Sequence, residues 1–246
     1  MKLIRVDTHE ELSQYVCRLC VQKIKELKNP VLGLATGSTP ERLYNLLAEQ
    51  YKIGNVSFKD TRTFNLDEYA GLSASNENSY RYFMDSILFN YIDIPYENTH
   101  VPNGTASDLK KESLAYEEKI QKAGGIDLQV LGIGRNGHIG FNEPGTSFES
   151  GTHVVNLDDS TRLANARFFT SQDKVPARAI TMGIRAIMES REIVLMVSGE
   201  KKAEALYKLM SGEVTEEFPA SVLQKHPNVL VVADRTARSV LVGLMG

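Results

Sequence analysis

The chain has few of the residues that build covalent or metal-based frameworks. Among its 246 residues there is no tryptophan, and there are only two cysteines, Cys17 and Cys20. Their C-x-x-C spacing would suit a redox motif at a strand-to-helix junction, but both fall within an amphipathic helical pattern. The sequence has no second cysteine pair to complete a zinc site. We therefore interpret both thiols as small apolar side chains on the core face of a helix.

The sequence also lacks a strong excess of charge and a long apolar run. Its 28 basic and 31 acidic residues give a formal net charge of −3, which argues against a nucleic-acid-binding surface. No apolar segment approaches the roughly 18 residues that a membrane helix requires. The first residues, Met1–Val6, lack the apolar core of a signal peptide. We expect a cytoplasmic protein that binds a small molecule, with neither nucleic acid nor a membrane as partner.

What the sequence does contain is an alternation of strand and helix patterns. Short apolar runs predict strands at 31–35, 63–66, 126–133, 153–157, 192–197 and 229–233. Helical patterns are expected at 8–28, 40–50, 79–90, 107–122 and 181–189, and from 200 onward. A capping box of Thr8 and Glu11 starts the first helix, and Thr181 is expected to cap a later one. This order predicts one α/β domain over 1–246: a three-layer, mostly parallel, Rossmann-like open sheet with helices on both faces.

Four predicted strands are followed by polar segments. These segments are Thr36–Thr39, Asp67-Glu68, Gly134–Glu143 and Ser198–Lys202. In an open parallel sheet, ligands bind beyond the carboxyl ends of the strands. We therefore expect all four segments to converge on one site.

The loop at 132–145 combines five glycines with a histidine, a carboxylate and an amide. An imidazole such as that of His138 suits acid/base catalysis, and Asn136 and Glu143 are close enough in sequence to hold its tautomer and orientation. A lone histidine is more often structural, but these neighbours favour chemistry. The start of the loop also matches G-x-G-x-x-G, a dinucleotide-binding pattern that requires a helix directly after it. The glycines and the proline that follow disfavour a helix, so we reject that interpretation.

The segment Gly37-Ser38-Thr39-Pro40 predicts an anion site. We expect Thr39 at the N-cap and Pro40 at the first helical position, with the helix N-terminus and two hydroxyls facing a ligand. The alternative is a well-capped turn without a ligand.

Basic residues near two other predicted elements add candidates for the same anion. Lys202, after Ser198-Gly199, can supply a compact positive charge, and Arg167 can form a bidentate contact with a phosphate.

Asp67 and Glu68 follow the strand at 63–66. Either can serve as a general base, and the alternative for a lone Asp at this place is a turn cap. Their expected position at the same sheet edge as the loop at 132–145 favours catalysis.

Taken together, these motifs closely resemble the glucosamine-6-phosphate deaminases. The matching segments follow the family's order: Ala35–Pro40, Phe64–Tyr69, Gly134–Pro144, Ser160–Phe169 and Val197–Ala203. They span nearly the whole chain, and the Gly-His-Ile-Gly-Phe-Asn-Glu-Pro core is highly specific. The resemblance implies an enzyme of amino-sugar catabolism. It would convert glucosamine 6-phosphate and water to fructose 6-phosphate and ammonia, without an organic cofactor or a metal.

The resemblance also implies roles for individual residues. His138, supported by Glu143 and Asn136, would open the pyranose ring, and Asp67 would then move the C2 proton to C1. The positions that match the phosphate site are Gly37, Ser38, Thr39, Arg167 and Lys202.

Three positions depart from regulated members of the family. Those members carry Asp where this chain has Asn136, and an amide can orient His138 without offsetting a full imidazolium charge. The Arg and Lys with which they bind N-acetylglucosamine 6-phosphate at a subunit interface correspond to His153 and Val155 here. We expect weak or no allosteric activation, and the oligomeric state, monomer or homo-oligomer, stays open.

Two other functions stay open at this stage. A 6-phosphogluconolactonase-like hydrolase shares the architecture and the phosphate turn, although lactone hydrolysis does not require Asp67 to abstract a C2 proton. A non-catalytic sugar-phosphate sensor domain would normally be fused to a DNA-binding segment, and none is visible before Val31. We also expect a lid within 140–190, because 145–151 is polar and rich in Gly, Ser and Thr.

Overall fold

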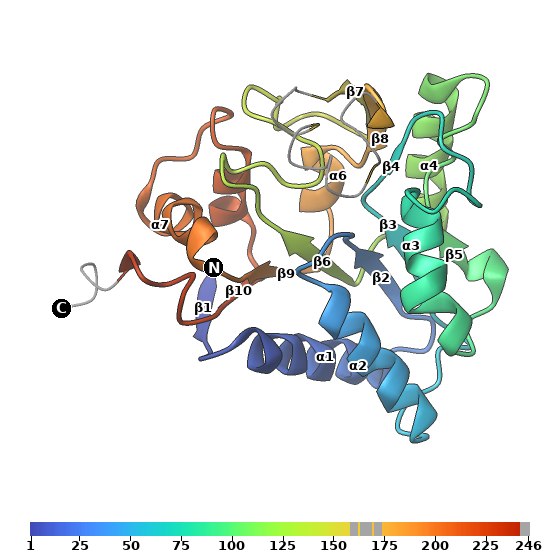
Figure 1. The fold of residues 1–246 in the computed structure, drawn as a ribbon, viewed down its shortest axis with the longest axis horizontal. Helices are drawn as coiled ribbons and strands as arrows, with labels where there is room; N and C mark the ends of the chain where they lie inside the picture. Colours follow the sequence, from blue (N-terminus) through green and yellow to red (C-terminus); the bar gives the residue numbers. More distant parts are fainter. Residues whose placement is uncertain (158–161, 163–168, 170–173, 242–246) are drawn as a thin grey trace.

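A parallel sheet forms the centre of the structure, a computed structural model that describes residues 1–157, 162, 169 and 174–241. Its strands are β1 (Lys2–Arg5), β2 (Val31–Leu34), β3 (Arg62–Asn65), β5 (Thr99–His100), β6 (Leu128–Gly132), β9 (Glu192–Val197) and β10 (Val229–Ala233). They lie in the order β1-β10-β9-β6-β2-β3-β5, and every pair of neighbours runs parallel (Figure 1). The predicted sheet is thereby confirmed, with β1 and β5 added at its edges.

The strands of this sheet are apolar on both faces, as strands between two helical layers must be. Along β9, Ile193, Leu195 and Val197 face one core, while Val194 and Met196 face the other. This period of two follows from the alternation of side chains along an extended chain.

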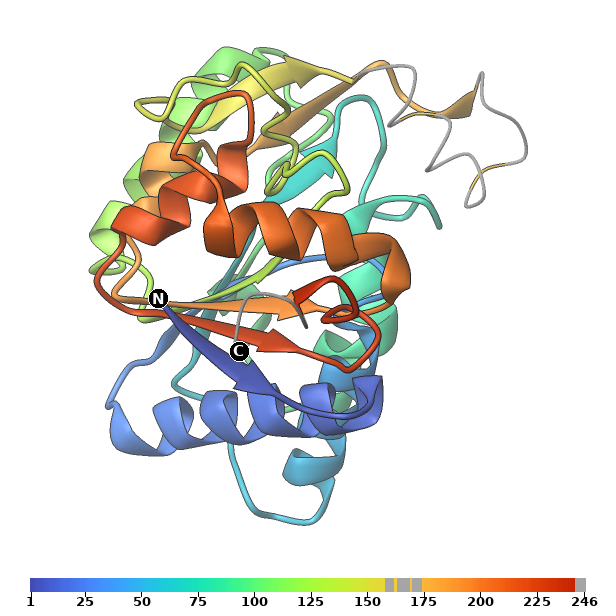
Figure 2. The same ribbon diagram turned by 90° about the vertical axis from the view of Figure 1, so that its left-hand side faces the viewer.

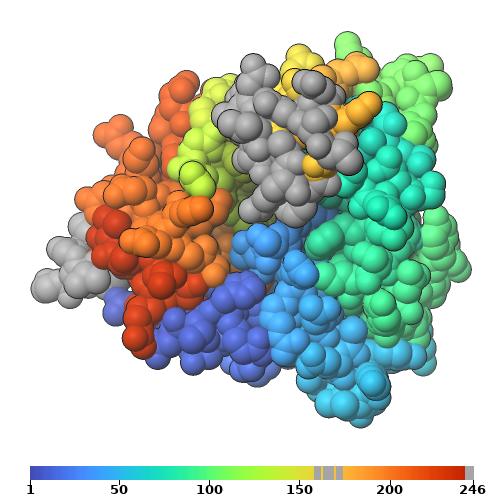
Figure 3. Space-filling view, viewed as in Figure 1, coloured from blue at the N-terminus to red at the C-terminus, as the bar shows by residue number. Residues whose placement is uncertain are grey.

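Helices cover both faces of the sheet. On one face lie α1 (His9–Glu26), α2 (Glu41–Lys52) and α3 (Tyr80–Ile87). On the other lie α4 (Leu109–Lys122), α6 (Ile184–Met188) and α7 (Ala203–Ser211). Figure 2 shows strands between α1, in blue, and α7, in orange, and the space-filling view places the same two segments at the lower edge and at the left (Figure 3). The three-layer α/β class is confirmed.

Short 3-10 helices and side-chain caps at the starts of α1, α3 and α4 complete these layers. The 3-10 helices are η1 (Phe89–Tyr91), η2 (Tyr96–Asn98), η5 (Glu200–Lys202) and η6 (Pro219–Lys225). The Thr8 side chain accepts a hydrogen bond from the Glu11 amide, as predicted, but the Glu11 carboxylate accepts from Asp7 N rather than from Thr8 N. In the described ranges, no helix has the length and apolar character needed to cross a membrane.

A second, smaller sheet was not predicted. It consists of β4 (Asp67–Tyr69), β8 (Arg178–Thr181) and β7 (His153–Asn156), in the antiparallel order β4-β8-β7. The strand expected at 153–157 therefore lies outside the main sheet. Thr181 ends a strand rather than capping a helix, because α6 starts only after Gly183. The β4-β8-β7 sheet forms by pairing between segments that are distant in sequence. Local hydrophobic periodicity does not predict such pairing.

Candidate active site

Four neighbouring strands deliver the polar segments to one edge of the main sheet. β9, β6, β2 and β3 are consecutive and parallel, so the segments after their carboxyl ends lie side by side. Leu66 N donates to Leu34 O, which keeps the β3 end paired with β2 up to the residue before Asp67. The predicted convergence of the strand ends is confirmed.

The loop after β6 holds His138, Asn136 and Glu143 in one hydrogen-bonded chain. Asn136 Nδ2 lies 2.6 Å from Glu143 Oε2, and Asn136 Oδ1 lies 2.8 Å from His138 Nδ1. His138 Nδ1 is also 3.4 Å from Glu143 Oε1. The imidazole side chain keeps 32% of its surface exposed, whereas the Glu143 side chain keeps 14%. The His138 ring is therefore accessible to a ligand, whereas the Glu143 carboxylate that supports it is largely buried.

This chain of contacts determines the imidazole tautomer. The Glu143 carboxylate only accepts hydrogen bonds when it is ionised, so the Asn136 amide turns its NH₂ group toward it. The Asn136 carbonyl oxygen is left facing His138 Nδ1, which must therefore carry the proton. In the neutral ring the lone pair then resides on Nε2. The arrangement presents Nε2 as a proton acceptor, in the way that a general base requires.

Two glycines shape the loop around this histidine. A methyl group on Gly134 would lie 2.3 Å from both Nδ1 and Cε1 of His138, so the imidazole occupies the space that a side chain would take. Gly137 has a φ of 85°, and a methyl group there would lie 2.3 Å from the Phe218 ring. Only glycine satisfies both the close approach and the left-handed conformation.

Asp67 lies directly beside this loop, in a buried position. The Asp67 residue is 6% exposed. A methyl group added at Gly140 would lie 3.5 Å from Asp67 Oδ2. Burial, with a smaller contribution from the charge of Glu68, raises the pKa of Asp67 to about 8. Desolvation disfavours the charged carboxylate and so makes it a stronger base once it is ionised. The structure thus brings the predicted base and the predicted histidine loop together.

Glu68 has a different environment, although it is adjacent in sequence. Its carboxylate accepts hydrogen bonds from the backbone amides of Tyr69, Tyr80 and Arg81, at 2.8, 3.0 and 2.9 Å. Burial raises the pKa of Glu68 to about 7, and these three donors offset only part of that rise. Glu68 therefore binds the N-terminus of α3 to β4 and is not available as a base.

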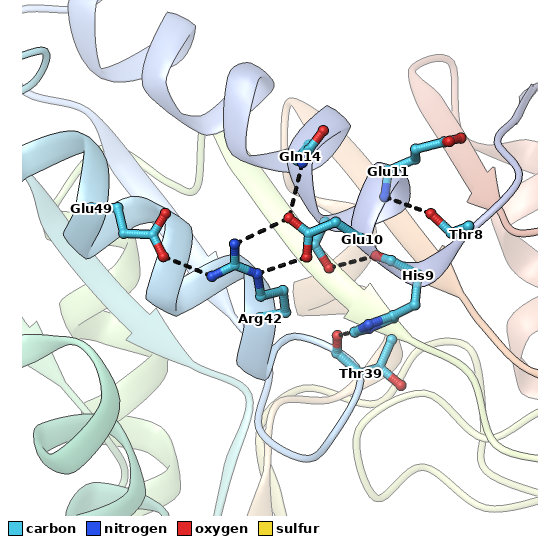
Figure 4. Close-up of polar contacts among 9 residues, drawn as sticks. Thr8, His9, Glu10, Glu11, Gln14, Thr39, Arg42 and Glu49 are labelled. Carbon is cyan, nitrogen blue, oxygen red and sulfur yellow. Dashed lines mark hydrogen bonds and ion pairs between the residues drawn. The ribbon is translucent and has the colours of Figure 1, made fainter.

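The turn at Gly37–Thr39 differs from its prediction in one respect. Pro40 occupies the N-cap of α2 without any side-chain capping hydrogen bond, so the expectation that Thr39 caps this helix is wrong. Gly37 has a φ of 109° and Ser38 is exposed, which leaves the turn open to a ligand. His9 Nε2 lies 2.9 Å from Thr39 O and ties the turn to α1 (Figure 4). An adjacent network, in which Arg42 contacts Glu10 and Glu49, joins α1 to α2.

The segment after β9 is shaped by a buried carboxylate. Asp234 accepts hydrogen bonds from Ser198 Oγ and Gly199 N, and Gly199 has a φ of 91°. Burial opposes ionisation of Asp234, but these donors and those at 236–237 outweigh it and lower the pKa. Lys202 follows in η5 at the same sheet edge. Arg167 and part of the expected lid within 140–190 lie outside the described residues.

Comparison with known proteins identifies the family. Residues 5–232 match the model of the family described as glucosamine-6-phosphate isomerases/6-phosphogluconolactonase. A glucosamine-6-phosphate deaminase of Oceanobacillus iheyensis is 60% identical, over 96% of this chain and 95% of its own. One from Shouchella clausii is 56% identical, over 98% and 97%. The chain belongs to this family, among its glucosamine-6-phosphate deaminases.

Solved structures agree with this family assignment. A monomeric glucosamine-6-phosphate deaminase superposes with a TM-score of 0.96 at 51% identity, covering 98% of this chain and 100% of that one. A 6-phosphogluconolactonase from Thermotoga maritima reaches a TM-score of 0.74 at 20% identity, over 95% and 99%, which shows a shared fold alone. The resemblance stated from the motifs is confirmed.

Two residues of this deaminase-family site were missed by sequence reasoning. Thr181 Oγ1 accepts a hydrogen bond from Phe141 N, and Asn142 Nδ2 donates to the carbonyl oxygens of Ile139 and Met182. Both residues are fully buried. The available signal for Asn142 was a polar residue inside the apolar part of the candidate loop, because buried polar groups are normally hydrogen-bonded. Thr181 gave no signal, because its neighbours in space are distant in sequence.

Proposed function

We propose that this site converts glucosamine 6-phosphate and water to fructose 6-phosphate and ammonia, the reaction that its resemblance to glucosamine-6-phosphate deaminases implies. The observation that carries the proposal is the pairing of a buried carboxylate, Asp67, with a histidine whose tautomer is determined by its neighbours. An aldose–ketose isomerisation needs a base at C2, and a ring-closed sugar first needs a proton exchange at its ring oxygen.

Ring opening is assigned to the loop after β6. His138 Nε2 takes the proton of the anomeric hydroxyl and returns it to the ring oxygen as the C1–O5 bond breaks. Asn136 holds the Nδ1 proton in place, and the Glu143 carboxylate stabilises the imidazolium that forms at that moment. The product of this stage is the open-chain aldehyde.

Isomerisation and deamination follow at Asp67. Its carboxylate removes the C2 proton while O1 takes up a proton in exchange for one that the amino nitrogen releases, so that a C1–C2 enolamine forms and then a C2 imine as the same carboxyl returns its proton to C1. The resulting C2 imine adds water, the C2–N bond breaks, and ammonia leaves as the ketone forms. Proton transfers of this kind contribute roughly 10²–10⁴-fold each.

Substrate phosphate is assigned to the segments after β2 and β9. Gly37, Ser38 and Thr39 form a turn in which Ser38 is exposed and the other two are half-buried, and Lys202 supplies a positive charge from the same sheet edge. Arg167 is proposed as a further phosphate ligand on the motif alone. The proposed lid within 140–190 would cover this bound substrate.

A coupled assay of ammonia and fructose 6-phosphate tests the function, with wild type and Asp67→Asn compared. Wild type should release both products from glucosamine 6-phosphate in equal amounts. Asp67→Asn should lose at least about 10²-fold in kcat, the contribution of one positioned proton transfer. A wild-type protein that hydrolyses 6-phosphogluconolactone and leaves the amino sugar intact would instead support the lactonase alternative.

The setting of the enzyme follows from the same proposal. We place it in the cytoplasm, because its substrate is a phosphorylated amino sugar. The solved relative at 51% identity is described as monomeric, which supports a monomer here. Because His153 and Val155 replace the basic residues of regulated members, we propose hyperbolic kinetics that N-acetylglucosamine 6-phosphate does not alter.

A further inference from the structure

The loop that carries His138 is attached to the strand pair that carries Asp67 by two buried side chains. Thr181 stands directly opposite Asp67 in the register of β8 and β4. Its Oγ1 accepts the Phe141 amide at 3.0 Å. From the loop side, Asn142 Nδ2 donates to Met182 O at 2.9 Å. We propose that Thr181 and Asn142 are positioning residues that hold the ring-opening group and the isomerising base in register over one bound substrate.

The burial of both polar groups supports this role. Thr181 and Asn142 are each 0% exposed. Thr181 shares a strand face with Ala179, which belongs to the small apolar core of Tyr69 and Phe141. Valine would fill such a position without a hydroxyl to satisfy, and a buried hydroxyl destabilises the fold unless it is bonded. The hydroxyl accepts the Phe141 amide of the loop after β6 and donates to Met182 O at 3.5 Å.

The attachment point explains why these contacts act on the site. Gly140 lies between Ile139 and Phe141. A methyl group added there would be 2.9 Å from Thr181 Oγ1 and 3.5 Å from Asp67 Oδ2. Met182 N donates to Leu66 O, directly before Asp67. The hydrogen bonds therefore run from Leu66 through Met182 and Asn142 to the loop, and His138 and Glu143 lie on either side of the attached segment.

Asn142 also closes the loop on itself. Besides Met182 O, its Nδ2 donates to Ile139 O at 2.8 Å, and its backbone amide donates to the same oxygen at 3.2 Å. The segment from 139 to 142 is thus a turn closed on itself and attached to β8 and the residue after it through Phe141 and Asn142. A displacement of this turn would move His138 and Glu143 together, relative to Asp67, and misplacement by about 1 Å is enough to reduce a rate 10²-fold.

Thr181→Val and Thr181→Ser form a matched pair that tests the proposal, which rests on the proposed function. Valine keeps the shape and removes the acceptor, while serine keeps Oγ1 and loses a methyl group. We expect Thr181→Val to lower kcat about 10- to 100-fold with KM changed less than about threefold, because binding contacts stay in place. Thr181→Ser should retain kcat within about threefold of wild type. Each variant is also assayed for exchange of the C2 hydrogen with deuterated water, which should fall together with kcat.

The outcomes separate this proposal from the proposed function. Wild type without deaminase activity would overturn the function itself. An active wild type whose kcat survives Thr181→Val, or a Thr181→Ser variant as impaired as the valine, would overturn the positioning role. Should the valine variant fail to fold, amide hydrogen exchange of wild type decides: the Phe141 amide should be protected as strongly as the core of β8. Rapid exchange at Phe141 would contradict the proposal.

Discussion

The Asn136 side chain lies between His138 and Glu143 and bonds to both. Its Oδ1 is 2.8 Å from His138 Nδ1, and its Nδ2 is 2.6 Å from Glu143 Oε2. A neutral amide therefore transmits orientation from the carboxylate to the imidazole without adding charge. This relationship sets the first prediction.

Asn136→Asp should change the pH dependence of ring opening. An aspartate would place a second negative charge beside the imidazole and favour its protonated form, so more alkaline solution would be needed to generate the neutral base. We expect the acid limb of the kcat/KM–pH profile to move to higher pH. Asn136→Ala, which removes the orienting contacts without adding charge, should lower the rate without moving that limb. Superimposable profiles for wild type and Asn136→Asp would refute this account.

Asp67→Asn should remove a pH dependence of stability. Because burial raises the Asp67 pKa from 3.8 to about 8, the folded state holds a proton that the unfolded state releases between these values. This contribution to stability is fully present below pH 3.8 and is lost as the pH rises through 8. Relative to wild type, the variant should gain free energy of unfolding as the pH rises from 5 to 8, by up to about 1.4 kcal/mol per pH unit, the slope for one proton.

Urea unfolding at pH 5 and pH 9 measures this effect. The difference between variant and wild type should be larger at pH 9 than at pH 5. An equal difference in free energy of unfolding at the two pH values would show that burial does not raise the Asp67 pKa in the folded protein.

Gly134→Ala should displace the imidazole of His138. The new methyl group would stand 2.3 Å from His138 Nδ1, so the ring must turn away from Asn136. We expect kcat to fall about 10²-fold, as for other misplacements of an acid/base group. Gly132→Ala is the matched control, because a methyl group there meets nothing within 4 Å. Equal activity of the two alanine variants would contradict the packing described for His138.

Lys202→Gln should weaken substrate binding. A hydrogen bond to a charged group contributes about 1.5–3 kcal/mol, so KM should rise roughly 10- to 100-fold with a smaller effect on kcat. Lys201→Gln is the control, since the neighbouring Lys201 is exposed. Inhibition by inorganic phosphate should weaken in parallel in the Lys202 variant alone. A similar KM in both variants would remove Lys202 from the phosphate site.

Much of the fold could be predicted because short-range patterns control it. The central strands β2, β6 and β9 are apolar runs between capped or glycine-terminated helices, and such strands pair in parallel between helical layers. Their polar ends therefore indicated the site before its geometry was known. The catalytic candidates Asp67 and His138 could be located on this basis alone.

The rest depended on contacts between distant segments. β4 is the polar triplet Asp67–Tyr69, which has no apolar alternation, and it pairs with β8 far along the chain. Thr181 looked like a helix cap because Ser and Thr residues often begin helices, but pairing with Asp67 places it in a strand. Thr39 looked like a cap for the same reason, yet Pro40 takes that position.

The position of Glu68 makes the strength of the base depend on the docking of a helix. After burial, its charge is the smaller contribution that raises the Asp67 pKa, and three amides at β4 and the start of α3 favour the ionised form of Glu68 against its own burial. Separation of α3 from β4 would remove two of these donors and favour the protonated form of Glu68. The repulsion acting on Asp67 would then disappear, and its carboxylate would become a weaker base. The docking of one helix end thus adjusts the basicity of Asp67, as a contribution smaller than the burial that mainly raises its pKa.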